Sequence, residues 1–334
     1  MPKVYEHNST YERNRPWVDF IIRHSYRRLQ YVGLERIPQD GAIIYAPNHC
    51  NALCDALAVL AMDSRPKVFA ARADIFRKPR VRKLLTWLKM MPIRRIRDGI
   101  DEVRRNDETI NLAVETLRND VPFCIMPEGT HRTKHSLLPL SKGIFRIALQ
   151  ANDAFGAEKP VYIVPVGLEY ADYFHLWDSL TLQIGRPINI TAYVSEHPDL
   201  DRPQLILALR DELTERMRET FLWVPDDEQY ESRSRALLAN PPAPFSRVRP
   251  KRWPAWLTAP LLVLLSPVLL LCLLLTVPLW LTDLIARKKV RDRAFLNSVR
   301  IVSHVIFFPL SLFLMWPFWL FVEEYFFRLR HLYC

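Results

Sequence analysis

The sequence predicts an α/β domain followed by a hydrophobic hairpin, and three observations lead to this fold class. Short apolar strands alternate with helical segments from about residue 35 to residue 225. The composition changes abruptly near Pro241, where a Pro-rich, basic stretch begins. Two long charge-free stretches then follow. We therefore expect four parts: an N-terminal amphipathic helical segment (1–34), the α/β domain (35–225), a linker (226–253) and a C-terminal hydrophobic hairpin (254–334).

Composition narrows the class of protein. With 49% hydrophobic and 25% charged residues among 334, neither a disordered chain nor a polytopic transporter fits. The 46 Lys and Arg against 36 Asp and Glu give a charge of +10, which suits an anionic partner. Nucleic acid is not expected, because no nucleic-acid-binding module is recognisable. The scarcity of Gly (8) disfavours dinucleotide loops, and five Cys without zinc-type spacing indicate a reducing compartment.

The N-terminal segment is expected to be helical. Its first residues are polar with no apolar run, so no signal peptide is predicted. From Trp17 to Val32, apolar residues alternate with Arg at a spacing typical of a basic amphipathic helix. Such a helix either packs on its own domain or docks on a membrane surface.

The α/β domain is predicted from alternating patterns. Apolar runs bounded by turn residues predict strands at 41–47, 67–71, 121–127, 161–170 and 180–190. Helical patterns occupy 51–62, 80–90, 101–119, 142–150 and 202–221. Pro165 interrupts the fourth of these strands, which predicts an edge position or a bulge there.

The two charge-free stretches run from Pro254 to Thr282 and from Ile301 to Val322. Both exceed the roughly 20 residues needed to cross a bilayer core, so a membrane anchor is expected. Basic clusters stand before, between and after the two stretches. Two full spans would place one cluster against the positive-inside tendency, whereas a re-entrant hairpin keeps every cluster on the cytoplasmic face. The sequence leaves both topologies open.

The chemistry is first suggested by His49, just past the end of the first predicted strand, with Asp55 six residues later. Ligands reach α/β sheets at the carboxyl ends of strands. A carboxylate that binds one imidazole nitrogen leaves the other basic enough to deprotonate a hydroxyl. Taken alone, such a pair can equally cap a helix.

Three further motifs accompany this pair. Pro127-Glu128-Gly129-Thr130 follows a strand and is itself followed by His131 and Arg132, a pattern able to hold a polar anionic ligand. Pro92-Ile93-Arg94-Arg95 carries guanidinium groups that suit phosphate, although basic runs are often only solvated. The last motif is Val164-Pro165-Val166.

In order and spacing, the four motifs resemble the glycerolipid O-acyltransferase family, which includes the glycerol-3-phosphate and lysophosphatidate acyltransferases. The resemblance covers about residues 35 to 190. It implies a mixed sheet flanked by helices, and transfer of a fatty acyl chain from acyl-CoA or acyl carrier protein to a hydroxyl, without metal or cofactor. It further implies that His49 is the general base and that Asp55 orients it. Acceptor and phosphate binding fall to Arg94, Arg95, Glu128, Gly129, Thr130 and Arg132, with Asn48 and Pro165 in supporting roles.

The chain departs from the family pattern at two points. Five residues rather than four separate His49 from Asp55, which on a regular helix rotates the carboxylate by about 100°. Either the turn after His49 absorbs the extra residue or the contact is less direct. The position after Glu-Gly-Thr, where the family commonly has Arg, is His131, so Arg132 becomes the candidate for phosphate contact.

The expected acceptor is 1-acyl-glycerol-3-phosphate, which would yield phosphatidate. Glycerol-3-phosphate or dihydroxyacetone phosphate is the alternative, and a non-catalytic membrane lipid-binding protein is the alternative of another class. The expected partners are membrane lipids and the acyl donor; the oligomeric state is not predicted. We expect the protein at a membrane with its catalytic domain on the cytoplasmic face, at the bacterial inner membrane or the endoplasmic reticulum.

Overall fold

The computed structural model describes residues 3–93, 101–246, 260, 264–267, 270, 277–290 and 292–307. The motif arginines Arg94 and Arg95 lie outside these residues. So do most of the first predicted hydrophobic stretch and all of the second after Phe307.

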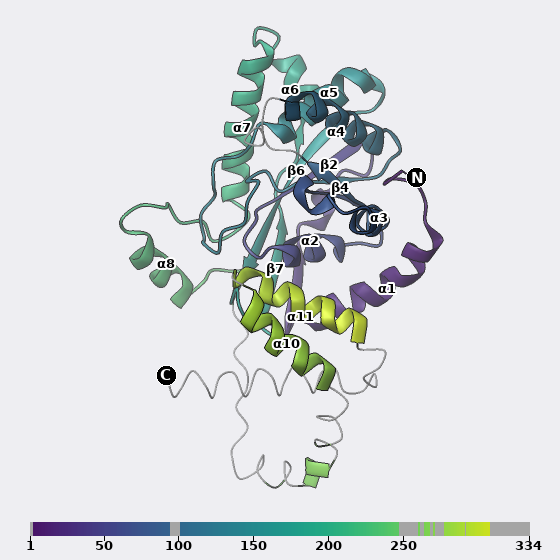
Figure 1. The fold of residues 1–334 in the computed structure, drawn as a ribbon. Helices are drawn as coiled ribbons and strands as arrows, with labels where there is room; N and C mark the ends of the chain where they lie inside the picture. Colours follow the sequence, from purple (N-terminus) through teal and green to yellow (C-terminus); the bar gives the residue numbers. More distant parts are fainter. Residues whose placement is uncertain are drawn as a thin grey trace.

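A mixed sheet forms the centre of the protein (Figure 1). Its strands are β1 (Arg28–Val32), β2 (Ala42–Pro47), β3 (Val68–Arg72), β4 (Met90–Ile93), β5 (Phe123–Cys124), β6 (Val161–Tyr170), β7 (Ser179–Ile184) and β8 (Ile188–Asn189). They follow the order β1-β7-β6-β2-β5-β3-β4, with β8 paired to β6. The pairs are parallel except β6–β7 and β6–β8. The predicted fold class, an α/β domain with a mixed sheet, is therefore confirmed.

Helices cover both faces of the sheet. They are α1 (Ser9–His24), α2 (Leu53–Leu60), α3 (Pro79–Trp87), α4 (Asp101–Arg118), α5 (Gly143–Phe155), α6 (Ile190–Glu196), α7 (Arg202–Arg218), α8 (Tyr230–Ala239), α10 (Val277–Lys289) and α11 (Ala294–Phe307). Successive residues of a strand point to opposite faces. Accordingly, Ile44 packs in a core with α4, α5 and α7, whereas Ile43 and Tyr45 pack in a second core with α1, α2 and α11.

The predicted helix over residues 17–32 is wrong in its second half. Helix α1 begins earlier, where the Asn8 side chain accepts a hydrogen bond from the Tyr11 N–H, and it ends at His24. Residues 28–32 form β1, which pairs in parallel with β7. Leu29 and Tyr31, two residues apart, both pack against the second core. That spacing of two is the period of a strand, and the basic residues just before Leu29, Arg27 and Arg28, obscured it.

The expectation of an edge position at Pro165 is also wrong. Strand β6 lies between β2 and β7, and Pro165 is paired with Ala46 of β2. On the other side of β6 the ladder is interrupted. Pairing of β6 with β8 extends only to Ile163, and pairing of β6 with β7 begins at Val166. Pro165 occupies this gap, where a missing N–H costs no ladder hydrogen bond. The interruption that a proline demands lies between two strands instead of at the sheet's edge.

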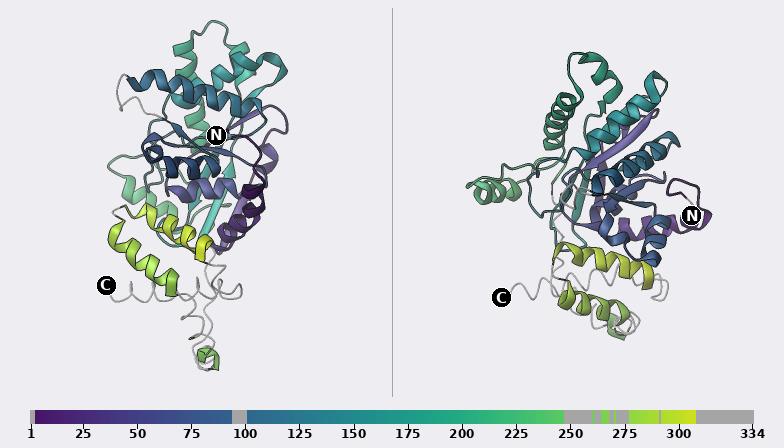
Figure 2. Two further views of the ribbon diagram at one scale, coloured as in Figure 1. Left: turned by 45° about the vertical axis from the view of Figure 1, so that its right-hand side comes forward. Right: turned by 45° about the horizontal axis from the view of Figure 1, so that its top comes forward.

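The C-terminal helices α10 and α11 lie side by side at one end of the protein (Figures 1 and 2). Helix α11 also packs against α1 and α2. Within the part of the chain that the structure describes, none of the helices is both long and apolar enough to cross a membrane. The predicted hydrophobic hairpin falls mainly on residues outside the described ranges.

The close approach of β6 to the segment after α7 generates a stability prediction. A Cβ added at Gly167 would collide with the carbonyl group of Thr220, which belongs to the backbone and cannot rotate away. We expect Gly167→Ala to lower the free energy of unfolding by about 1 to 3 kcal/mol, measured by urea denaturation. Gly143→Ala is the matched control, because a Cβ there meets no atom within 4 Å and lies at the start of a helix. Equal losses in the two variants would contradict the prediction.

Candidate active site

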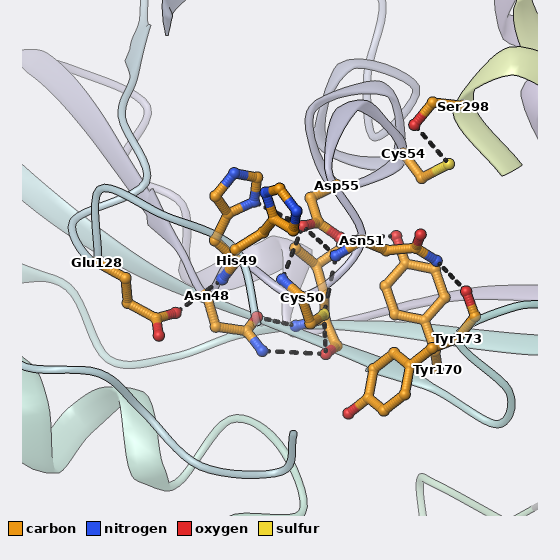
Figure 3. Close-up of polar contacts among 12 residues, drawn as sticks. Asn48, His49, Cys50, Asn51, Cys54, Asp55, Glu128, Tyr170, Tyr173 and Ser298 are labelled. Carbon is orange, nitrogen blue, oxygen red and sulfur yellow. Dashed lines mark hydrogen bonds and ion pairs between the residues drawn. The ribbon is translucent and has the colours of Figure 1, made fainter. Parts of the chain in front are cut away.

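Asn48 anchors the first motif to the sheet. Immediately after β2, its N–H donates to the Val166 carbonyl at 3.1 Å. Its side-chain amide then pairs with both backbone groups of Leu168, accepting from the N–H at 2.6 Å and donating to the carbonyl at 3.2 Å (Figure 3). The side chain thus extends the β2–β6 pairing by one residue. The pairing sets the direction in which the chain leaves toward His49, and the supporting role expected of Asn48 stays a prediction.

His49 and Asp55 are in direct contact. The Nδ1 atom of His49 lies 2.8 Å from Oδ2 of Asp55, whose side chain is fully buried, while His49 keeps 18% of its side chain exposed. The same Oδ2 accepts the N–H groups of Cys50 and Asn51, each at 2.8 Å, and Oδ1 accepts the Tyr170 hydroxyl at 2.9 Å (Figure 3).

This set of donors assigns the histidine tautomer. Because Oδ2 of Asp55 already accepts two backbone N–H groups, Nδ1 of His49 is assigned as a further donor to this oxygen. Nε2 then carries the lone pair of the neutral ring. Within the described part of the chain, no hydrogen-bond partner is seen for Nε2. The pair therefore presents a partly exposed base oriented by a buried anion, which is the arrangement of a general base.

The extra residue between His49 and Asp55 is absorbed before helix α2 begins. Ala52 has φ +48° and ψ −124°, a backbone conformation unusual for a residue with a Cβ, and the Cys54 N–H donates to the Asn51 carbonyl. The helix starts only at Leu53, so the rotation expected on a regular helix does not occur. Of the two possibilities left open by the spacing, the turn absorbs the residue and the contact stays direct.

Glu128 joins the third motif to the first. Its Oε1 accepts the His49 N–H and its Oε2 accepts the Leu138 N–H, both at 2.8 Å. Burial raises the pKa of the Glu128 carboxyl to about 7, against these two hydrogen bonds, which lower it. Both oxygens are thus used to hold the loop between Glu128 and Leu138 against the backbone of His49. The expected contact of Glu128 with an acceptor stays a prediction.

Gly129 and Thr130 form the turn that follows. The Gly129 N–H donates to the Met126 carbonyl at 3.1 Å, and Gly129 has φ +68°, in the left-handed region that favours glycine. A Cβ there would meet no atom within 4 Å, so the backbone conformation, not lack of room, explains the glycine. Thr130 is exposed. Their expected roles in acceptor binding stay predictions.

Arg132 already has protein partners. Its guanidinium pairs with Asp226 and donates to the Ser136 hydroxyl at 2.7 Å. Its backbone N–H donates to the His49 carbonyl at 3.0 Å. The structure therefore brings Arg132 beside the first motif, but a phosphate would have to compete with Asp226 for the side chain.

The side chain of His131 lies against the ring of His49. The His131 and His49 rings meet edge to face with centroids 5.4 Å apart, and the Phe295 ring contacts His131 in the same way at 5.2 Å. Nε2 of His131 lies 2.6 Å from Oδ2 of Asp292, just before α11. Sequence reasoning noted His131 only as a departure from a pattern and missed Asp292 altogether.

Tyr170 was also missed, although a signal for it exists. It ends the predicted strand 161–170, next to β2 in the sheet, and is the one residue of that strand other than Tyr162 with a hydroxyl. Because β2 and β6 are parallel, their carboxyl ends meet at the same edge, which brings Tyr170 near His49 and Asp55. Burial raises the pKa of Tyr170 well above its ordinary value, so its hydroxyl remains a donor to Asp55.

Comparison with known proteins identifies the domain that carries this site. Residues 28–169 match the family model described as acyltransferase. This part of the chain is an acyltransferase domain. The matched region includes Asn48, His49, Asp55 and Glu128, and it ends just before Tyr170. The prediction of an acyltransferase enzyme is therefore confirmed.

Among the solved structures that are similar to this chain is the 1-acyl-sn-glycerophosphate acyltransferase PlsC of Thermotoga maritima. The two share 18% sequence identity and superpose with a TM-score of 0.42, over 65% of this acyltransferase and 84% of that chain. No curated protein matches this acyltransferase in sequence.

The buried Glu128 of the acyltransferase should make stability depend on pH. The folded protein holds the Glu128 proton up to pH about 7, whereas the unfolded chain releases it near 4.5. The folded state therefore binds more protons between these values, and its stability falls as pH rises through this window, by about 3 kcal/mol for this group.

Glu128→Gln removes this titration. We expect the difference in unfolding free energy, variant minus wild type, to increase as pH rises from 4.5 to 7. The measurement is urea denaturation of both proteins at each pH. Glu219→Gln is the control, since Glu219 is exposed and pairs with Arg186 on the surface. A Glu128→Gln curve that runs parallel to the wild-type curve would contradict the prediction.

Proposed function

We propose that this acyltransferase moves a fatty acyl chain from acyl-CoA or acyl carrier protein to the hydroxyl of a phosphoglycerol acceptor. The first candidate acceptor is 1-acyl-glycerol-3-phosphate, with phosphatidate as the product. The observation that carries the proposal is the direct His49–Asp55 contact, with Nε2 of His49 left to act on a hydroxyl.

The reaction follows from this geometry. Nε2 of His49 takes the proton of the acceptor hydroxyl as its oxygen attacks the thioester carbonyl carbon. The imidazolium formed at His49 is stabilised by the Asp55 carboxylate, which keeps its own hydrogen bonds from Tyr170 and the backbone. When the carbon–sulfur bond breaks, the departing sulfur takes the proton from His49, which gives an ester and a free thiol. We propose no metal or cofactor, because a thioester is already activated toward attack.

The phosphoglycerol class is supported by charge and by the motifs. The chain carries ten more basic than acidic side chains. We propose that Arg94 and Arg95 bind the acceptor phosphate, with Arg132 beside them. They follow β4, which pairs in parallel with β3, so their segment begins at the same sheet edge as Asn48. Glycerol-3-phosphate carries the same phosphate and stays the alternative acceptor.

We further propose that the enzyme works at a membrane, with its catalytic domain on the cytoplasmic face. The support comes from the two charge-free stretches and from α10, whose outer face exposes Val277, Leu281, Leu284 and Ile285. These positions recur at helical spacing, so they form one apolar stripe, and Lys288 and Lys289 follow it. An apolar stripe with basic residues at its end suits an anionic bilayer surface.

The test of the catalytic proposal is acyl transfer by purified protein. Labelled acyl-CoA and acyl carrier protein are each incubated with lysophosphatidate, glycerol-3-phosphate, dihydroxyacetone phosphate or another lysophospholipid, and the lipids are then separated. We expect phosphatidate from the first acceptor, and a loss of about 100- to 10,000-fold in kcat/KM for His49→Ala. His24→Ala, which changes an exposed histidine, serves as the control.

Each outcome of this assay decides a different part of the proposal. Consumption of glycerol-3-phosphate alone would replace the acceptor and keep the chemistry. Full activity of His49→Ala would remove the general base. Lipid binding without transfer from either donor would favour the alternative of another class, a non-catalytic lipid-binding protein.

A further inference from the structure

The segment just before α11 reaches the proposed catalytic base through one side chain. Asp292 holds Nε2 of His131 at 2.6 Å, and the His131 ring packs edge to face on His49. Phe295 also contacts the His131 ring, edge to face. A residue about 240 positions from His49 in sequence is therefore separated from it by a single imidazole.

Asp292 is itself fixed in place. Its Oδ1 accepts the Ala294 N–H at 3.0 Å, at the start of α11, which leaves Oδ2 to accept from His131. The hydrogen bond from His131 lowers the pKa of Asp292, so the group stays a carboxylate and a strong acceptor. One carboxylate thus ties the beginning of a helix to the ring beside His49.

The way α11 packs shows that this contact is not an isolated surface pair. Its buried face is largely polar: beside Ala294 and Ile301 it carries Asn297, Ser298, Arg300, Ser303 and His304, while Phe295, Val302 and Ile306 are exposed. Ordinary amphipathic helices are oriented the other way. Several of these polar residues bind the segments that build the site.

Two of these polar residues, Asn297 and Ser298, connect α11 to the turn that follows His49. Asn297 and Asn51 donate to the same carbonyl, that of Tyr173, at 3.0 and 2.9 Å. Ser298 lies 3.6 Å from the sulfur of Cys54, next to Asp55 in sequence (Figure 3). Helix α11 is therefore seated on the turn that carries the catalytic pair, and this seating places Asp292 at His131.

We propose that Asp292 is a positioning residue for catalysis, which acts through His131 by holding that ring against His49. This proposal deepens the function proposed above, on which it depends, because it needs His49 as the base. The His49 ring is oriented on one side by Asp55 and would be kept from tilting by the His131 edge on the other. Small displacements of a catalytic group have large effects on rate, so loss of this support should be seen in kcat.

The test is a double-mutant cycle in the acyl-transfer assay. Asp292→Ser keeps a side chain able to cap α11 but is too short to reach His131, and His131→Ala removes the ring. We expect each variant to lower kcat about tenfold with little change in KM for either substrate. The double variant should be no slower than His131→Ala, because the two residues act as one unit. Melting temperatures are measured for all of them.

Asp153→Ser is the matched control. Asp153 is exposed to a similar degree (59% against 53% for Asp292) and also binds a cationic partner, Arg202, at 2.7 Å, but it lies on α5 away from the site. Its kcat should equal that of the wild type.

Three results would overturn the inference. These are a wild-type kcat for Asp292→Ser, multiplicative losses in the double variant, or a lowered melting temperature as its sole effect. Each is distinct from failure of the proposed function, which would appear as full activity of His49→Ala. An inactive His49→Ala together with a fully active Asp292→Ser would reject the role of Asp292 alone.

Discussion

The buried carboxylate of Asp55 is the constraint on which the site depends. A fully buried anion is tolerated only when donors surround it, and Asp55 receives them from His49, Tyr170 and two backbone N–H groups. These donors come from the turn after β2 and from the end of β6, so satisfying the charge also fixes the two segments against each other. The orientation of the His49 ring is then a consequence of folding, and no substrate is needed to create it.

The sequence predicted the parts of this arrangement that local pattern determines. Buried parallel strands read as continuous apolar runs, and for this reason β2, β3 and β6 were found nearly at their true bounds. Short or half-buried elements lack that signal: β4 has four residues, and β1 has five half-buried residues that directly follow a helix rich in Arg. Pro165 correctly predicted an interrupted ladder. The interruption lies between the β7 and β8 pairings, and this place depends on the order of the strands, which a local sequence pattern does not contain.

The same distinction holds for the candidate site: residues in short motifs could be predicted, and residues brought there by packing could not. His49, Asp55 and Glu128 belong to short motifs with recognisable spacing, and the structure brings all three together. Arg132 was chosen by its charge, yet its side chain is paired with Asp226, a partner more than ninety residues away. Asp292 lies in a basic segment between two apolar ones and carries no motif. Only packing of α11 on the domain brings it to His131, and packing of distant segments cannot be read from one sequence.

The packing of α11 on the domain through polar side chains has a practical consequence for handling the protein. A fragment cut at the Pro-rich linker, the obvious place to remove the apolar tail, would also discard α11. The surface thus uncovered includes Trp17 of α1, whose indole N–H donates to the Val305 carbonyl, and Cys54 of α2, which lies against Ser298. A shortened version intended for crystallisation should instead end after Phe307, so that residues 308–334 are removed while the helix that covers this surface is retained.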